Sequence, residues 1–185
     1  MPVIIEFSRC IGTYSSAKFE LFIIESVILC IVFTMIVMIP VYKNPMSMIA
    51  SYPPKIRARV ESLPQYRGCF KQKEKSHIKR KIVSCFIVVF LLALLDWFSG
   101  AQTFGTAFVY SFALFFVVNL YDLFVLDIGI TCHDKRIRIP GTEDMEQEYR
   151  KIGHHVRGAV KGICIGAVVS MLSALIVLIM GFLIK

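Results

Sequence analysis

The stretch AVKGICIGAVVSMLSALIVLIMGFLI, residues 159–184, decides the fold of this chain, and its only charged residue is Lys161. A bilayer core about 30 Å thick takes roughly 20 apolar residues of helix to cross. Three further apolar runs approach or exceed this length, at residues 19–42, 82–98 and 103–128. We expect all four runs to be transmembrane helices, because a strand or loop exposed to lipid leaves backbone amides without partners.

The composition agrees with an integral membrane protein. Of the 185 residues, 56% are hydrophobic and 15 are Phe, and the mean hydropathy is +0.67. A water-soluble core does not need this apolar content, and the length suits one domain. The sequence therefore predicts a single all-α membrane domain over residues 1–185, a four-transmembrane-helix bundle with a short amphipathic cytoplasmic helix.

The basic residues orient the chain in the bilayer. Eighteen of the 21 Lys and Arg residues fall within residues 43–81 and 135–161, with a dense cluster at 71–81 and none at 99–102. The positive-inside rule places both polar loops, 43–81 and 129–158, in the cytoplasm and both termini outside it. We expect a bacterial-type plasma membrane, with anionic lipid head groups as partners of the loops. No nucleic-acid partner is expected, because the loops lack a recognisable binding motif.

Each polar loop contains a segment with helical character. In the first loop, Ile56 and Val60 recur at helical spacing among cations, which predicts an amphipathic segment lying on the membrane surface. In the second loop, Pro140-Gly141 is a turn signal and Thr142 is a suitable helix N-cap. We expect a short amphipathic helix to follow Thr142.

The fourth apolar run carries a ridge of small residues at every fourth position: Gly158, Gly162, Gly166, Ser170 and Ala174. Such a ridge lies on one side of a helix and lets another helix backbone approach closely. The spacing predicts a tight helix contact. It does not distinguish a partner helix in the same chain from one in a second copy.

Ionisable residues inside the apolar runs are candidate functional groups, because each costs about 2.5 to 3.5 kcal/mol near the bilayer centre. Glu25 lies in the outer third of the first run, where it can make a buried hydrogen bond or bind a proton or cation. Asp96 is followed by Trp97, a residue typical of the membrane interface. We therefore expect Asp96 at the outer interface.

The cytoplasmic end of the third run concentrates polar groups. Asn119, Asp122 and Asp127 fall within an arc of about 140° on an α-helix. Basic residues of the second loop are expected at the same depth, so ions and substrates could bind where runs three and four meet. These residues are Arg136, Arg138, His154, His155 and Arg157.

Four of these residues, Asp122, Asp127, His154 and His155, are called the inner cluster. Carboxylates with imidazoles can bind a divalent cation, which in turn can hold a lipid phosphate with help from a loop arginine. They can instead transfer protons, since histidine titrates near neutral pH. A third interpretation pairs Asp122 with Arg157 to fasten two helices. No spacing matches a recognised zinc or calcium motif, so the three interpretations stay open.

Two functional hypotheses follow. In the first, the protein is non-enzymatic, either an oligomeric transporter or channel or a membrane assembly partner. Four helices are too few to enclose a wide path, so transport predicts a homo-oligomer. In the second, it is a membrane enzyme acting on a lipid-linked or phosphate-bearing substrate at the cytoplasmic face. Its candidate catalytic residues are Asp122, His154 and His155, and it requires a cavity within one monomer.

Overall fold

A computed structural model of the chain describes residues 2–67 and 70–184, with side chains over 18–67 and 82–184. The cation cluster at 71–81 therefore lies outside the described side chains. Within the described ranges the chain is all-helical and forms no strand. The predicted all-α class is confirmed.

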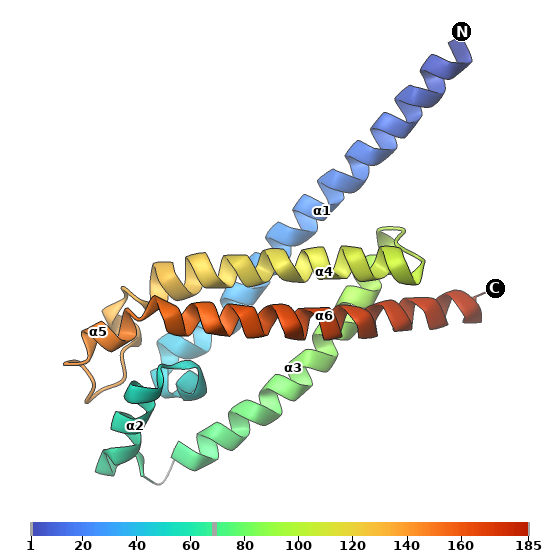
Figure 1. The fold of residues 1–185 in the computed structure, drawn as a ribbon. Coiled ribbons are helices and arrows are strands. Elements are labelled where there is room, and N and C mark those ends of the chain that lie inside the picture. Colours follow the sequence, from blue (N-terminus) through green and yellow to red (C-terminus); the bar gives the residue numbers. More distant parts are fainter. Residues whose placement is uncertain (1, 68–69, 185) are drawn as a thin grey trace.

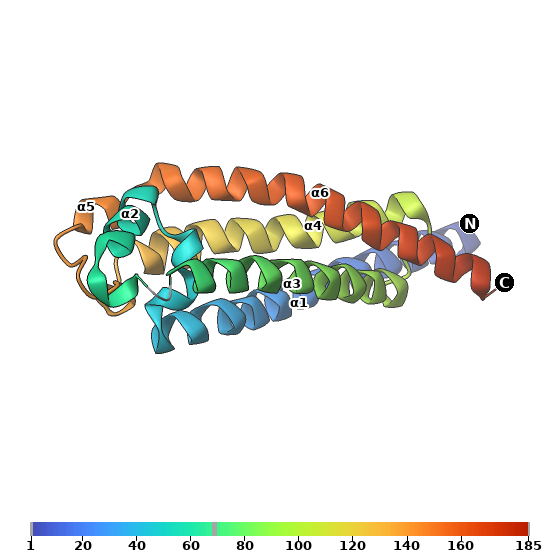
Figure 2. The ribbon, with the colours of Figure 1, turned by 90° about the horizontal axis from the view of Figure 1, so that it is seen from below.

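Four long helices form an elongated bundle (Figures 1 and 2). They are α1 (Pro2–Lys43), α3 (Phe70–Phe98), α4 (Phe104–Tyr121) and α6 (Ile152–Leu183). A π-helix, η3 (Asp122–Thr131), continues α4 toward the second polar loop.

Three helical segments are long and apolar enough to cross a membrane: Lys18–Lys43, Phe104–Thr131 and Glu146–Leu183. The apolar part of α3, Ile82–Phe98, is shorter. The ends of the runs differ from those expected, because helical backbone continues past the apolar sequence. In particular, α6 begins at Ile152 and so includes both histidines that the sequence placed in the loop.

Helix α6 packs along α4 and α3, and α4 also contacts α1. The interior of the bundle divides into two buried groups. One contains Val89, Leu92, Leu114 and Val169. The other is built from smaller side chains, which allow close helix contact: Ala93, Ala107, Ala174 and Val177.

A tight hairpin connects α3 to α4 at the end of the bundle near the chain termini (Figure 2). Gly100 has a φ of 79°, which favours glycine because other residues are strained there. Thr103 caps α4 by accepting the backbone N–H of Thr106, and the Thr106 side chain accepts that of Thr103.

The two polar loops fold together at the opposite end of the bundle (Figures 1 and 2). We call this unit the cap and define it as residues 44–67 and 132–151. Its short helices are η1 (Pro45–Ser51), α2 (Pro54–Ser62), η2 (Pro64–Tyr66), η4 (Lys135–Ile137) and α5 (Glu146–Tyr149).

The cap has a hydrophobic core of its own, to which both loops contribute. The rings of Tyr52 and Tyr149 meet edge to face, with centroids 5.8 Å apart. The Tyr52 hydroxyl donates to the carbonyl of Ile137 at 2.8 Å, and the Tyr149 hydroxyl accepts the N–H of Ile139 at 3.1 Å. The buried tyrosine of each loop, Tyr52 in the first and Tyr149 in the second, therefore forms a hydrogen bond through its hydroxyl inside the cap.

The first loop does not lie on the membrane through Ile56 and Val60, as the sequence analysis expected. Both side chains are 0% exposed and belong to the cap core. The second loop supplies their apolar partners, Ile139 and Tyr149. The spacing of apolar residues within one loop does not reveal a partner in a loop about 80 residues away. For this reason the sequence alone predicts that the apolar face of α2 contacts lipid.

The second loop also differs from the expected turn and helix. Gly141 has a φ of 88°, consistent with the turn signal. However, Thr142 is not a helix N-cap: its buried hydroxyl donates to the Ile139 carbonyl at 2.7 Å and lies 2.7 Å from the Tyr149 hydroxyl. The Glu143 carboxylate instead accepts the N–H of Gly141 at 2.9 Å. Helix α5 is consequently a single turn.

We predict that Ile56→Ala loosens both loops together. The substitution leaves a cavity in the shared core and should cost about 2 to 5 kcal/mol of cap stability. Hydrogen exchange should accelerate in residues 54–62 and also in residues 137–149. Arg59→Ala, an exposed change on the same helix, is the control and should leave both segments as in the wild type. Acceleration confined to residues 54–62 would contradict a shared core.

Candidate functional site

The cap end of the bundle holds a contact between α6 and η3, which His155 and Asp127 make. His155 is 5% exposed, and its Nδ1 lies 3.1 Å from Oδ2 of Asp127. Its Nε2 is buried and has no hydrogen-bond partner among the described residues. A carboxylate on one ring nitrogen fixes the orientation of the imidazole and leaves the other nitrogen available.

The π-helical backbone brings the two aspartates of the inner cluster onto one side. In η3 the hydrogen bonds run between residues five apart, as from the N–H of Cys132 to the carbonyl of Asp127 at 3.0 Å. Asp122 and Asp127 are also five apart, so they lie about one turn apart along the axis instead of about 140° around it. Asp122 is half-buried.

His154 is directed away from this group. Its Nε2 lies 3.0 Å from the carbonyl oxygen of Ser51 in the cap, and its ring stands at 80° to that of His155. The described residues contain no group of three or more His, Cys, Asp or Glu side chains placed to hold a metal ion. His154 contacts the cap and does not join Asp122, Asp127 and His155 in the described structure, and the divalent-cation site stays a prediction.

Near the cap, residues other than the predicted Asp122–Arg157 pair join the helices. Arg157 is exposed and forms no ion pair with Asp122, although both lie in the described part of the chain. The Asn119 amide instead donates to the carbonyl of Ala159 at 3.1 Å, joining α4 to α6. Together with the His155 pair, this hydrogen bond connects the inner ends of the helices.

The two loop arginines are engaged within the cap and its junction with α1. Arg136 forms a 2.9 Å ion pair with Asp134, and the Tyr42 hydroxyl donates to the same carboxylate at 2.8 Å. These bonds, led by those from Arg136, hold the pKa of the Asp134 carboxyl well below its usual range. Arg138 lies 3.3 Å from Glu146 and over the Tyr149 ring.

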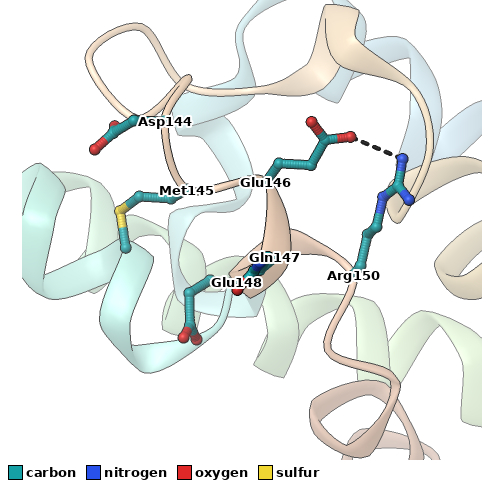
Figure 3. Close-up of a pocket in the computed structure, with 6 residues that line it drawn as sticks. All are labelled: Asp144, Met145, Glu146, Gln147, Glu148 and Arg150. Atoms are coloured by element: carbon teal, nitrogen blue, oxygen red, sulfur yellow. Dashed lines mark hydrogen bonds and ion pairs between the residues drawn. The ribbon is translucent and has the colours of Figure 1, made fainter.

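A shallow hollow beside α5 is lined by cap residues (Figure 3). Glu146 is paired with Arg150 at 2.7 Å, and Glu148 is paired with Lys55 at 2.9 Å. These carboxylates are already neutralised by cations, which leaves little free charge for a ligand. No residue of the inner cluster lines the hollow: it is formed by Asp144, Met145, Glu146, Gln147, Glu148 and Arg150.

Glu25 lies inside the bundle, near the end opposite the cap. Its side chain is 8% exposed, and its Oε2 accepts a hydrogen bond of 2.7 Å from the Tyr110 hydroxyl. The Tyr110 ring packs edge to face on Phe22. This hydrogen bond joins α1 to α4, and Tyr110 is the buried hydrogen-bond partner of Glu25.

Asp96 is a buried acid that the sequence analysis assigned to the interface. It is 0% exposed, and its Oδ2 accepts hydrogen bonds from Ser111 at 2.6 Å and Ser173 at 2.8 Å. The hairpin after α3 and the small residues of the neighbouring helices close over it. The sequence signals that could have located this site are Ser111 in run three and Ser173 in run four.

These residues form what we call the acid network. It comprises Glu25, Asp96, Tyr110, Ser111 and Ser173, and all four long helices contribute to it. The hydrogen bonds form two separate sets, one between Glu25 and Tyr110 and the other among Asp96, Ser111 and Ser173.

The ridge of small residues on α6 faces α4 over most of its length. An added Cβ at Gly162 would collide with the Asn119 side chain, and one at Gly166 would collide with the Phe115 ring. Ser170 and Ala174 are fully buried. At Gly158 an added Cβ meets no described atom within 4 Å. The partner of the ridge is therefore a helix of the same chain.

No protein-family model, curated protein or solved structure matches this chain. Its function is consequently inferred from the geometry of the acid network and the inner cluster.

We predict that Gly166→Ala destabilises the bundle, because the added methyl group enters the space of the Phe115 ring. Overpacking of this kind costs about 1 to 3 kcal/mol, which should lower the midpoint of thermal unfolding in detergent. Gly158→Ala is the matched control on the same ridge and should be neutral or stabilising by up to about 1 kcal/mol. Equal damage from both substitutions would place the ridge against a second copy.

Proposed function

We propose that the protein spans the membrane four times, with the cap in the cytoplasm and both termini on the other side. The shared core of the two basic loops supports this topology, because both loops must then lie on one side. The apolar part of α3, Ile82–Phe98, rises about 25 Å at 1.5 Å per residue, close to the thickness of a hydrocarbon core. The short cytoplasmic helix after Thr142 corresponds in this proposal to α5, whose buried residue is Tyr149.

The cations of the cap favour a bacterial-type plasma membrane with anionic lipids at its inner surface. In this setting the cap lies against the head groups, and its internal ion pairs hold the two loops together. The lipid surface is the partner that the charge supports best.

Within this topology, the protein acts as a non-enzymatic carrier of protons or small cations. One observation carries this proposal: carboxyls from α1 and α3 are joined to hydroxyls of α4 and α6 inside the bundle. Ionisable groups within membrane helices are costly and are retained mainly along ion or proton pathways. The acid network lies among buried apolar groups, and in this proposal it is the polar route through the bundle.

A proton or small cation needs a chain of polar groups, whereas a larger substrate needs an open path. The four helices of one monomer can supply such a chain. A homo-oligomer is part of the proposal, and its contacts use surfaces other than the ridge, since α4 covers the ridge within each copy.

We predict that vesicles containing the protein carry protons and that Glu25→Gln slows the flux at least about tenfold, equivalent to about 1.4 kcal/mol. The amide keeps the shape of Glu25 but cannot exchange a proton at neutral pH. A pH-sensitive dye inside the vesicles measures the rate under a cation gradient. Glu20→Gln, an exposed position further out on α1, should match the wild type. Wild-type flux equal to that of empty vesicles would refute the proposal.

The alternative function, a membrane enzyme at the cytoplasmic face, is favoured by one observation. Asp127 contacts Nδ1 of His155, and the opposite nitrogen is buried and unpartnered within the described structure. A carboxylate that orients an imidazole in this way is typical of a general base. The substrate of this candidate carries a lipid chain or a phosphate and approaches from the inner leaflet.

This second candidate predicts a change in lipid that depends on His155. Vesicles of phosphatidylglycerol and phosphatidylethanolamine are incubated with the purified protein, and their lipids are followed by mass spectrometry. The wild type should alter a lipid and His155→Gln should not. His154→Gln, whose ring contacts Ser51, should retain most of the conversion. Unchanged lipid composition with the wild type would count against this activity.

A further inference from the structure

The carboxyl of Asp96 is incompletely satisfied although it is fully buried. Oδ2 accepts two hydroxyl groups, whereas Oδ1 is buried without any partner in the described part of the chain. A second buried oxygen, Oγ of Ser170, is also unpartnered there. Ser170 lies three residues from Ser173, so both hydroxyls are on the same side of α6.

Oxygen atoms that lack hydrogen-bond partners inside a membrane destabilise the folded protein. A buried polar group without a hydrogen bond costs about 1 to 3 kcal/mol, and an unpaired charge costs more. An occupant that contacts Oδ1 removes the cost directly.

We propose that Asp96, Ser111 and Ser173 bind a small monovalent cation of the sodium class, which competes with a proton for Oδ1. This inference rests on the proposed carriage of protons or small cations and names the site and the ion. The donors are a carboxylate and hydroxyl groups, the hard oxygen ligands that such ions prefer. Serine hydroxyls accept as well as donate, so each can turn a lone pair toward the cation.

The net charge of the site favours a cation that carries one positive charge. Asp96 supplies one carboxylate, and the serines are neutral, so a monovalent cation or a proton leaves the site neutral. A divalent cation would leave an uncompensated charge inside the bundle, which the low dielectric penalises. The Ser111 and Ser173 oxygens are 3.2 Å apart and come from different helices, so the ligands are held by the packing of α3, α4 and α6.

Glu25 provides the next acidic group for an ion that leaves Asp96. Its Oε2 accepts the Tyr110 hydroxyl at 2.7 Å, and Tyr110 precedes Ser111 in α4. Binding at Asp96 can therefore be tested separately from carriage, which also requires Glu25.

The test uses the purified full chain in detergent and measures thermal unfolding in NaCl and in choline chloride at equal ionic strength. At pH 8, NaCl should raise the unfolding midpoint by about 5 °C at saturation. At pH 5 the rise should shrink, because protons occupy the same oxygen. Asp96→Asn should abolish the rise, and Ser173→Ala should increase the sodium concentration required about tenfold, since one of three ligands is lost.

Glu25→Gln separates this inference from the proposed function. It should slow the flux into vesicles at least about tenfold and keep the sodium-dependent rise. A wild type that carries protons but responds equally to sodium and choline would overturn the sodium site and leave the carrier intact. A retained rise in Asp96→Asn would also overturn it. If Asp96→Asn does not fold, Ser111→Ala and Ser173→Ala decide the matter, and wild-type sodium responses in both would refute the site.

Discussion

Close contact between α6 and α4 is the interaction on which the rest of the structure depends. It is possible because α6 presents glycine where Asn119 and Phe115 of α4 approach. This contact fixes the rotation and height of α6 in the bundle. It thereby places Ser173 within hydrogen-bond distance of Asp96 at one end and His155 beside Asp127 at the other. A larger side chain at Gly162 or Gly166 would disturb the polar contacts at both ends, because the same helix carries Ser173 and His155.

The polar groups of the bundle fall into two sets with different chemistry. The acid network contains carboxyls and hydroxyls, which can exchange protons and bind hard cations. The inner pair contains an imidazole oriented by a carboxylate, and its free nitrogen is suited to accept a proton. The π-helix η3 supports the inner pair, because spacing of five residues per hydrogen bond places Asp122 on the same side as Asp127. Both sets are compatible with proton handling, and only the acid network involves all four long helices.

The cap joins two loops that are distant in the sequence. Described cations of the cap pair with acidic residues of α5, as Lys55 does with Glu148 and Arg150 does with Glu146. The aliphatic and aromatic residues of the two loops instead meet in one core. The cap therefore connects the inner ends of α1 and α6, and His154 adds a further contact through the Ser51 carbonyl. A change of orientation at α6 would consequently be transmitted to the cap.

The sequence by itself determined the all-α class, the membrane-length helices and the presence of acids within apolar runs, because bilayer thickness and the cost of unpaired amides act on local stretches. It also located Glu25 and the small-residue ridge. Only the tertiary structure decided which residues meet. Asp96 is buried where serines from two other helices donate hydrogen bonds to it. The His154 ring contacts the Ser51 carbonyl of the cap. Ile56 packs in the same core as Tyr149. Each of these contacts joins residues distant in the chain, and local periodicity holds no information on such pairs.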